Sequence, residues 1–408
     1  MGATFMLVAI PSIQKNFHPT FDSPHQLQQQ HHPKLLYTAE MAAKAVEPTV
    51  WTCGKKGDRQ KGDDAIDPIT NQRPFFAFVH VYKTGGTTVR EFFKEYATIC
   101  KKSLAIVGHC DHSTAEKCKL ISSVNAPQNI ERVNSTILHD HYDMLGGHFS
   151  FGMADDIFPT AAATPNNDSG NATSTPQVRH MVFLRQPITK FVSHVLYQQK
   201  QGNQNKTDTL EETVEDIKKR VRNFREDGEY IGSLKFPQAP FMFNQLLTQE
   251  QKKQSENQEQ TLEELVALKT QLAIDNLMQY NAIVGITEMV PQSIEIFEHA
   301  LGQIVTSASK KEKVQNFFSR YTDEDEPRKK NGRKKNGSSR GSISTGSVLK
   351  ELNKDDEFMA IFREFVKYEQ RIVDFAMDMH QKQYEAVKKG HFERYVENSD
   401  GSRASVGM

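Results

Sequence analysis

The sequence lacks a net charge, a long apolar run and a lipidation signal, and each absence excludes a class of protein. The chain of 408 residues carries 51 basic and 51 acidic side chains, so its overall charge does not favour nucleic acid as a partner. The apolar run at residues 5–10 is far shorter than the ~20 residues of a membrane span, so neither an anchor nor a clear signal peptide is visible. Met6, where a Ser or Thr would be needed, excludes N-myristoylation.

The few cysteines exclude the common zinc patterns. Three of the four lie within one segment, so a disulfide can form if the compartment is oxidising, although the spacing does not give the pairing. The cysteines are Cys53, Cys100, Cys110 and Cys118, with no Cys-x-x-Cys pair and no Cys/His zinc spacing. Five glycosylation sequons favour a secretory protein, with chance as the alternative because Asn, Ser and Thr are common here. They begin at Asn134, Asn167, Asn171, Asn205 and Asn336.

A low apolar content shapes the expected domain organisation. Hydrophobic residues make up 37% of the chain, which predicts polar insertions around an ordinary core. Residues 1–73 are rich in Gln, His, Pro and Lys, and predict a disordered or loosely attached segment. Residues 323–347 combine an acidic patch, a basic run and Gly/Ser repeats, which predicts a disordered insertion, and residues 391–408 predict a loose tail. The folded domain is therefore expected at residues 74–390.

The strongest local pattern lies at residues 75–93. An apolar, aromatic run typical of a buried strand leads into a glycine turn and then a helix start, where Thr88 and Glu91 have capping-box spacing. Glycine lets the backbone approach a ligand and the first helical N–H groups point at it, so the stretch predicts a seat for a phosphate or phosphosulfate. The alternative is a polar turn with a solvated lysine. The turn and helix start consist of Lys83, Thr84, Gly85, Gly86, Thr87 and Thr88.

Strands alternate with helical patterns along the rest of the chain. Apolar runs at residues 178–184 and 282–286 predict buried strands, and residues 147–152 predict a short strand leaving a glycine turn. Pro187 fits the first turn of a helix, and residues 355–389 predict a final amphipathic helix. The alternation predicts an α/β fold with a mainly parallel central sheet flanked by helices. In such a fold the loop after the first strand lies at the carboxyl edge of the sheet, where ligands bind.

Arg185 and Ser193 form a second polar pattern. Arg185 directly follows the predicted strand at residues 178–184, and Ser193 falls outside the apolar stripe of the next helix. An arginine and a serine so placed can grip one phosphate, the arginine through a charge-assisted fork. The alternative is an arginine that caps a carboxylate and a serine that faces solvent.

Three stretches of the chain, taken in order, resemble the carbohydrate sulfotransferases that use PAPS (3′-phosphoadenylyl sulfate). The first, His-Val-Tyr-Lys-Thr-Gly-Gly-Thr-Thr at residues 80–88, resembles the family's 5′-phosphosulfate loop, except that Tyr82 stands where Pro is usual. The resemblance spans roughly residues 75–390 and is closest to the branch of the uronyl and heparan sulfate 2-O-sulfotransferases. The other two stretches are Phe-Leu-Arg-Gln-Pro at residues 183–187 with Phe-Val-Ser-His at 191–194, and Val-Gly-Ile-Thr-Glu at 284–288.

The resemblance implies a P-loop-like sulfotransferase fold and a reaction that moves a sulfuryl group from PAPS to a carbohydrate hydroxyl. It implies that the loop at residues 83–88 binds the phosphosulfate and that Lys83 stabilises the charge on the leaving phosphate. Arg185 and Ser193 would hold the 3′-phosphate and so select PAPS over ATP. His148 would be the general base, since imidazole titrates near neutral pH, with a structural histidine as the alternative.

The chain departs from the family at the proposed base. The uronyl branch has His-Gly-His where this chain has Gly146, Gly147 and His148, so one histidine is missing. His139 and His141 are at most acceptor contacts. Glu288 either orients groups of the site or is a solvated acid at a helix entry.

Two other functions stay open at this point. One is a small-molecule kinase with a divergent phosphate loop. Two features argue against a kinase: Lys83 precedes both glycines of the loop, and the chain has the Arg185/Ser193 pair. The other is a catalytically silent glycan-binding protein of the same fold, which Tyr82 and Gly146 favour. The sulfotransferase reaction requires no metal, and no Asp is placed as a magnesium ligand. The resemblance implies a glycoprotein of the Golgi lumen or secretory pathway, in a family usually anchored in the membrane.

Overall fold

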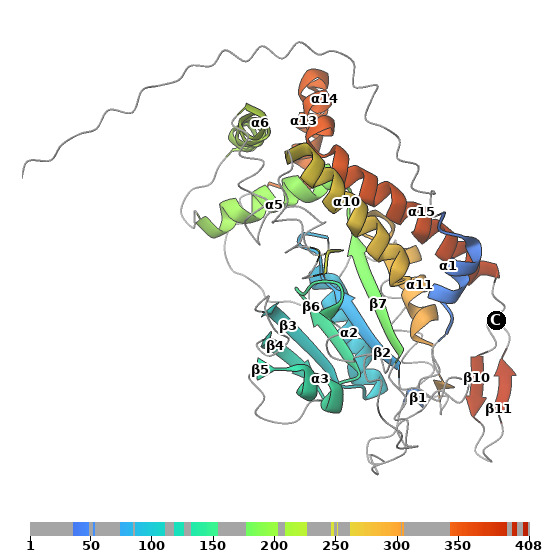
Figure 1. The fold of residues 1–408 in the computed structure, drawn as a ribbon. Helices are drawn as coiled ribbons and strands as arrows, with labels where there is room; N and C mark the ends of the chain where they lie inside the picture. The colour runs from blue at the N-terminus through green and yellow to red at the C-terminus, as the bar shows by residue number, and fades with distance from the viewer. Residues whose placement is uncertain are drawn as a thin grey trace, which may run out of the picture. The chain divides into compact units, whose positions relative to one another are not determined.

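The computed structural model describes the chain in segments, and all of its helices and strands belong to one unit, Tyr37–Met408 (Figure 1). The predicted insertion at residues 323–347 lies outside the described residues up to residue 342, so its disorder there stays a prediction. At its end the prediction is wrong, because Ser344 caps a helix that begins at Thr345. The described residues are 36–48, 52–53, 74–84, 86–110, 118–125, 132–153, 177–202, 209–226, 246–248, 251, 262–302, 304–305, 343–389, 394–397 and 403–406.

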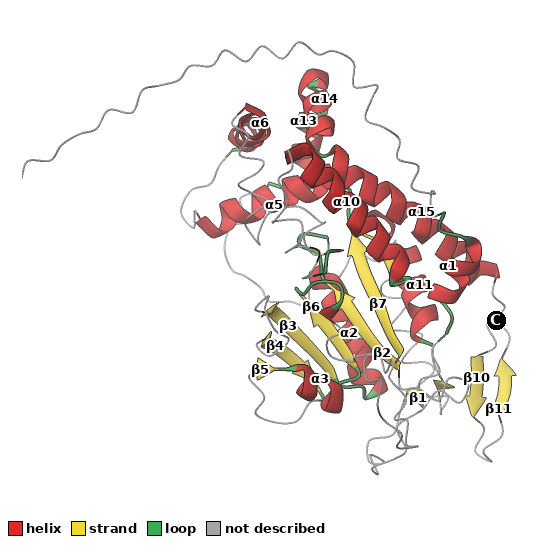
Figure 2. Ribbon diagram, viewed as in Figure 1, coloured by secondary structure: helices red, strands yellow, loops and turns green. Residues whose placement is uncertain are grey.

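A seven-stranded sheet in the order β5-β4-β3-β6-β2-β7-β8 forms the centre of the fold. The five strands from β3 to β8 in that order are parallel to one another, whereas β4 runs antiparallel to β3 and to β5. Figure 2 shows the strands in yellow with helices on either side, which confirms the predicted α/β fold with a mainly parallel sheet. The strands are β2 (Pro74–Val79), β3 (Leu104–Cys110), β4 (Cys118–Val124), β5 (Arg132–Val133), β6 (Met144–Gly147), β7 (Gln177–Leu184) and β8 (Ile283–Ile286).

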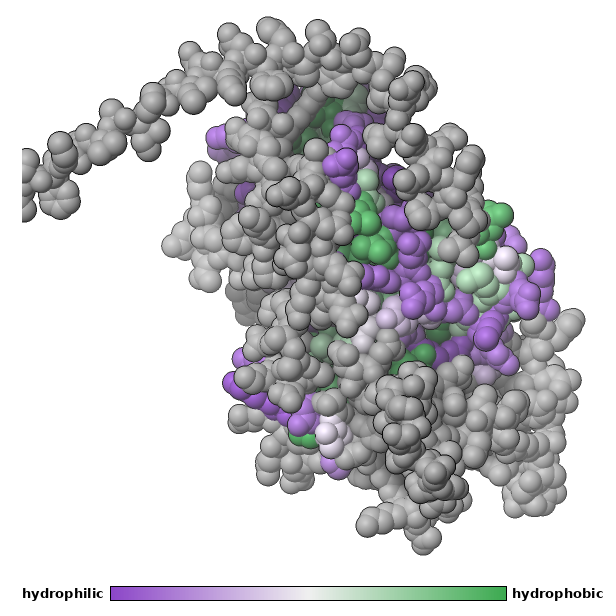
Figure 3. Space-filling view, in the orientation of Figure 1, coloured by the Kyte–Doolittle hydropathy of each residue, from purple (hydrophilic) through white to green (hydrophobic). Residues whose placement is uncertain are grey.

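Strand β2 is apolar on both faces because helices cover both sides of the sheet. Phe75 and Ala77 point into one core and Phe76 and Phe78 into the other. The first core is closed by α1, α10 and α15, and the second by α2 and α11. Figure 3 shows hydrophilic side chains mixed with hydrophobic ones over the visible face of α10, α15 and α1. The helices are α1 (Ala39–Ala45), α2 (Gly86–Cys100), α3 (Ser135–His141), α10 (Leu262–Gln279), α11 (Val290–Leu301) and α15 (Lys367–Lys389).

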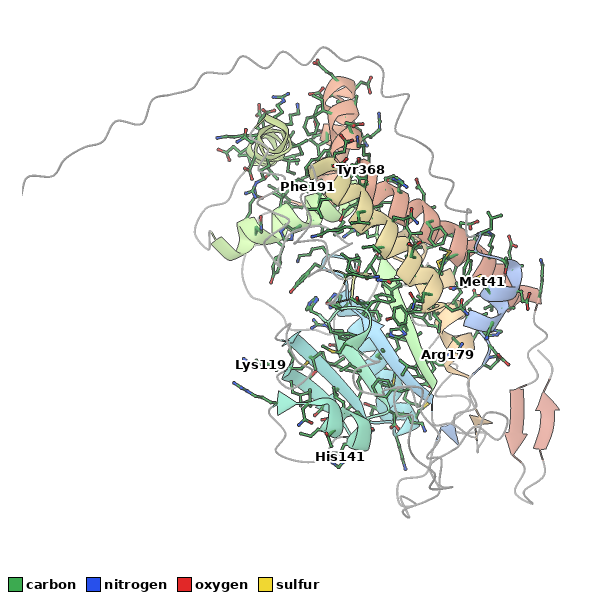
Figure 4. All side chains as sticks on the ribbon, viewed as in Figure 1. Met41, Lys119, His141, Arg179, Phe191 and Tyr368 are labelled. Carbon is green, nitrogen blue, oxygen red and sulfur yellow. The ribbon has the colours of Figure 1, made fainter. Side chains whose placement is uncertain are left out.

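A third core lies among the helices α5, α6, α13 and α14. Phe191 of α5 meets Phe362 of α14 edge to face at 5.4 Å between ring centroids, and Figure 4 labels Phe191 at this end of α5. A buried ion pair joins α5 to α15, with Lys190 Nζ 3.0 Å from a carboxylate oxygen of Glu369. No helix in the described part of the chain is long and apolar enough to cross a bilayer. These helices are α5 (Pro187–Gly202), α6 (Leu210–Glu226), α13 (Thr345–Leu352) and α14 (Asp356–Phe365).

Several predicted boundaries differ from the structure. Helix α2 begins at Gly86, so Thr88 lies inside its first turn and does not cap it. Strand β6 ends at Gly147, so the predicted strand at residues 147–152 lies too late in the chain. The predicted final helix is two helices, α14 and α15, which break at Val366. The break lets α14 face the third core and α15 the first, which one straight helix cannot do.

Part of the segment predicted to be loosely attached is packed. Tyr37 and Ala42 are buried, and α1 lies against α15. Arg179 fixes this helix because its guanidinium donates to the carbonyls of Ala45 and Glu47 at the end of α1, and to that of Ala300 at 3.2 Å at the end of α11. Figure 4 shows Arg179 near the start of β7. Residues 1–35, 49–51 and 54–73 lie outside the described part, where loose attachment stays a prediction.

Short strands occur at both ends of the unit. Strand β1 (Thr52–Cys53) pairs in parallel with β9 (Ile304–Val305), and β10 (Arg394–Glu397) pairs antiparallel with β11 (Arg403–Val406). The second pair falls within the tail predicted to be loose. The ribbon does not stand alone, because β10 contacts β9, so residues 394–397 and 403–406 are more ordered than the predicted loose tail.

Two features bear on the expected oxidising compartment. Cys100 at the end of α2 and Cys118 at the start of β4 are both disulfide-bonded, and no described cysteine is free. Of the sequon residues, Asn134 caps α3 by accepting a hydrogen bond from the backbone N–H of Ile137 at 2.8 Å. The other four sequons lie outside the described residues.

Candidate functional site

Four chain segments meet at the carboxyl edge of the parallel sheet. The loop Val81–Thr84 follows β2, His148 follows β6, Arg185 follows β7, and Thr287 follows β8. Because these strands are neighbours in the order β6-β2-β7-β8, the residues after them are brought to one place. This edge of an open α/β sheet is where ligands bind.

The loop after β2 is held in a compact conformation by its own threonine. The Thr84 side chain is buried, and its hydroxyl donates to the carbonyl of Val81 at 2.9 Å. Lys83 has a φ of 62°, in the left-handed region that non-glycine residues rarely adopt. The side chain of Thr84 therefore shapes the loop. An anion could be contacted by the backbone N–H of Thr84 but not by its hydroxyl. Gly85 lies outside the described residues.

The predicted helix start supplies backbone donors directly after this loop. Gly86, Thr87 and Thr88 form the first turn of α2, whose N–H groups have no intrahelical partner. The side chains of Thr87 and Thr88 lie outside the described part of the structure. An anion at this helix start is favoured by these donors and by the helix dipole.

Neighbouring strand ends anchor the loop from outside. Thr287 Oγ1 lies 2.7 Å from the carbonyl oxygen of Thr84 and 2.9 Å from that of Leu184. Arg185 Nη1 donates to the carbonyl of Lys83 at 3.2 Å. The ends of β7 and β8 therefore hold the loop of β2, and sequence reasoning gave Thr287 no such part.

Arg185 is brought to the loop and keeps donors for an anion. Its Nε lies 3.8 Å from Glu288 Oε1, and Glu288 also accepts from the backbone N–H of Gln186 at 3.3 Å. Burial lowers the pKa of Arg185, while the Glu288 carboxylate opposes that shift. A guanidinium carries five N–H donors, so these contacts leave Nη2 for an anion. Glu288 therefore lies close to Arg185 and the start of α5 while its side chain stays partly exposed, and the choice between its two expected roles stays a prediction.

The middle of α5 faces the loop through an aromatic ring. Lys83 Nζ lies 3.1 Å from the ring centroid of Tyr197, a cation–π contact. Ser193 stands one helical turn before Tyr197, so both are on the same face of α5. Ser193 is half-buried, and among the described residues no hydrogen bond joins it to Arg185. The structure thus brings Ser193 to the side of α5 that faces Lys83, but not into contact with Arg185.

The histidine of α5 stays neutral near these cations. His194 has its pKa lowered to about 4, first by burial and then by the charges of Lys190, Lys83 and Arg220. It is therefore uncharged at neutral pH, and a proton carrier at this position is not expected.

The geometry of His148 defines which of its nitrogens carries the proton. Its Nδ1 lies 2.8 Å from the carbonyl oxygen of His80. A carbonyl only accepts, so Nδ1 must carry the hydrogen, and Nε2 has the lone pair in the neutral ring. Gly147 permits the turn into His148: its φ is 146°, and a Cβ there would lie 2.0 Å from the Val107 carbonyl oxygen. His148 therefore has the tautomer that a base acting through Nε2 requires.

The ring of His148 lies between two other aromatic rings. Tyr82 stacks on it at 4.0 Å between ring centroids and 8° between planes, and His80 at 4.2 Å and 25°. His80 is buried, and burial lowers its pKa well below the usual range, with smaller effects from His148 and Arg90. Sequence reasoning missed both contacts, because they follow from the pairing of β2 with β6, and Val79 with Gly147 in particular.

Gly146, where the resemblance would place a second histidine, is closely surrounded by side chains. Gly146 is buried, and a Cβ there would lie 2.9 Å from Ile106 Cδ1 and 3.6 Å from Phe78 Cδ1. A histidine would therefore require Ile106 to move.

His139 and His141 lie at the other end of the sheet. Both are on α3, which precedes β6, so they belong to its amino edge, and Figure 4 shows His141 away from the carboxyl ends of the strands. His141 is exposed, and the side chain of His139 lies outside the described part of the structure. Neither is placed to contact an acceptor next to His148.

Within the described segments, no group of three His, Cys, Asp or Glu residues is arranged to hold a metal ion. Searches against protein-family models, curated proteins and solved structures return no match to this chain.

Proposed function

We propose that this chain is a PAPS-dependent carbohydrate O-sulfotransferase with a P-loop-like sulfotransferase fold. The observation that carries the proposal is the meeting of three groups at one sheet edge. These are the Lys83 loop, an arginine that retains donors, and a histidine whose Nε2 has a lone pair. Each group matches one need of sulfuryl transfer: an anion seat, a phosphate clamp and a base.

The nucleotide would be held by the loop and by the next strand. The N–H groups at the start of α2 and Lys83 would bind the 5′-phosphosulfate, because both favour negative charge there. Arg185 Nη2 and the Ser193 hydroxyl would bind the 3′-phosphate, which distinguishes PAPS from ATP. Lys83 would first leave the ring of Tyr197, from which it lies 3.1 Å, so nucleotide binding would replace one cation contact by a stronger one.

The reaction would be an in-line displacement at sulfur. The acceptor hydroxyl oxygen forms a bond to sulfur while His148 Nε2 takes its proton. The bond between sulfur and the phosphate oxygen breaks, and the electron pair leaves with the phosphate as PAP. Negative charge grows on that oxygen, and Lys83 with the N–H groups of α2 would stabilise it.

The disulfides support the proposed compartment. Cys100 and Cys118 are both disulfide-bonded, and such bonds persist in oxidising compartments. A Golgi or secretory location is therefore proposed together with the glycan acceptor.

Two measurements test the proposal. Calorimetric titration should show binding of PAP and little binding of ATP, and the reverse result would favour a kinase. Transfer of labelled sulfate from PAPS to an unsulfated polysaccharide rich in uronic acid should be catalysed by the full chain. PAP binding without transfer to any such polysaccharide would favour a silent glycan-binding protein.

A further inference from the structure

The imidazole of His148 is covered on both of its faces. Tyr82 and His80 each lie nearly parallel to it, with centroid distances of 4.0 Å and 4.2 Å. Two rings this close cannot share one face of an imidazole, because side by side they would overlap each other. They therefore lie on opposite faces, and the three rings form a stack with His148 in the middle.

The stack and the hydrogen bond together leave the ring one orientation. The bond from Nδ1 to the His80 carbonyl holds one edge of the imidazole, and the flanking rings prevent rotation about its last side-chain torsion. A hydroxyl can then reach Nε2 only in the plane of the ring. A base needs this arrangement, since proton transfer requires a hydrogen bond directed at the lone pair.

We infer that Tyr82 is a positioning residue for the proposed sulfuryl transfer, because its ring, opposite that of His80, holds the His148 imidazole with Nε2 directed at the acceptor hydroxyl. The inference rests on the proposed function and adds to it the part played by a residue that departs from the family pattern. In the proposed reaction Tyr82 touches neither nucleotide nor acceptor.

The two flanking rings suit an imidazole that gains a proton during the reaction. When His148 becomes an imidazolium, the electron-rich face of Tyr82 attracts it. His80 on the other face stays neutral, because burial lowers its pKa well below the usual range. His80 itself therefore adds no positive charge beside the imidazolium, and the cations near the stack are Arg90 and Lys83. Burial also raises the pKa of Tyr82, which stays a neutral phenol.

The kinetic test compares two substitutions at one position. Tyr82→Leu fills space without an aromatic face and should lower kcat about tenfold, with KM for PAPS within about twofold of wild type. Tyr82→Phe keeps the face and should restore most of kcat. Tyr384→Leu, near the end of α15 and outside the site, controls for the loss of a tyrosine. A normal kcat in Tyr82→Leu would overturn the inference and leave the proposed function intact.

An NMR test detects the three-ring stack without measuring turnover. In histidine-labelled wild-type protein, the ring protons of His148 should be shifted upfield by the two flanking rings, whereas those of exposed His141 should not. The His148→Ala spectrum assigns the signals. Tyr82→Phe should keep the upfield shift, and Tyr82→Leu should lose about half of it. Ordinary shifts for His148 in wild type would overturn the inference. If the stack is present but wild type binds no PAP and transfers no sulfate, the proposed function fails instead.

Discussion

At the scale of single residues, three polar groups of the site are each restrained by a neighbour. The carbonyl of His80 determines the tautomer of His148, and the buried hydroxyl of Thr84 is used within the loop. Arg185 is held by the loop on one side and by Glu288 on the other. These restraints predict that neighbouring residues of the site fail in different ways when they are replaced.

His148→Ala should lose turnover while still binding PAP. A positioned general base contributes about 10²–10⁴ in rate, and the nucleotide contacts come from the loop and Arg185. Lys83→Ala should reduce both turnover and PAP affinity, because Lys83 would touch the transferring group. Sulfate transfer and PAP affinity are measured for both variants with one acceptor. Loss of PAP binding in His148→Ala as severe as in Lys83→Ala would show that His148 is structural or lines the nucleotide site.

At the scale of elements, the strands place the site and the loops are held by residues from neighbouring strands. Thr287 shows this best, because one hydroxyl lies within hydrogen-bond distance of the carbonyls of Thr84 and Leu184. It thereby joins the ends of β2, β7 and β8 at the point where the anion would bind. Loop geometry at this site is therefore a property of three strands.

Thr287→Val should weaken nucleotide binding without unfolding the protein. Valine keeps the shape of threonine but cannot donate, so the loop loses an anchor worth about 0.5–1.5 kcal/mol, or about two- to thirteenfold in PAP affinity. Thr287→Ser keeps the hydroxyl and should bind PAP nearly as wild type. Calorimetry gives the affinities, and equal PAP binding by Thr287→Val and wild type would mean that the loop holds its shape without this contact.

Some of these helices and strands could be predicted from the sequence, and others could not. The strand before Lys83, the helix beginning at Pro187 and the strand ending at Ile286 were predicted correctly, because local periodicity and proline placement define them. Strand β6 and helix α13 were misplaced or missed, since Gly146 and Gly147 carry no apolar pattern and α13 follows a Gly/Ser stretch. The stack on His148 depends on the register between β2 and β6, which no local pattern encodes.

At the scale of the whole molecule, disulfides and buried histidines outside the site determine how the stability of the fold depends on redox conditions and pH. The disulfides of Cys100 and Cys118 lie on the half of the sheet that carries β3 and β4, and buried histidines lie beneath the other half. Both kinds of group predict conditions under which the entire domain loses stability.

Reduction of the disulfides should lower the melting temperature. Removing a native disulfide typically costs about 2–5 kcal/mol, because the reduced unfolded chain gains freedom. Thermal melts with and without dithiothreitol, together with a count of free thiols, check this. Complete reduction with no change in melting temperature would show that these bonds contribute little, and would weaken the argument for an oxidising compartment.

Buried histidines predict a loss of stability in mild acid. Burial lowers the pKa of His180 and of His380 to about 4, from an ordinary value of 6.5. The unfolded chain therefore takes up protons near pH 6.5 that the folded molecule accepts only near pH 4. Between those values the unfolded state binds more protons, so the free energy of unfolding falls as the pH is lowered, and the full contribution is present above pH 6.5.

His180 provides the sharpest test of this sensitivity. Its Nε2 has no hydrogen-bond partner within the described residues, and its ring stacks on Phe151 at 5.4 Å and lies 4.6 Å from that of Tyr280. Phenylalanine suits these neighbours and does not titrate. The melting temperature of His180→Phe should therefore fall less than that of wild type when the pH is lowered from about 7 to about 5. The exposed His141→Gln should behave as wild type. An equal loss in His180→Phe and wild type would mean that the folded protein accommodates the His180 proton, contrary to its burial among aromatic rings.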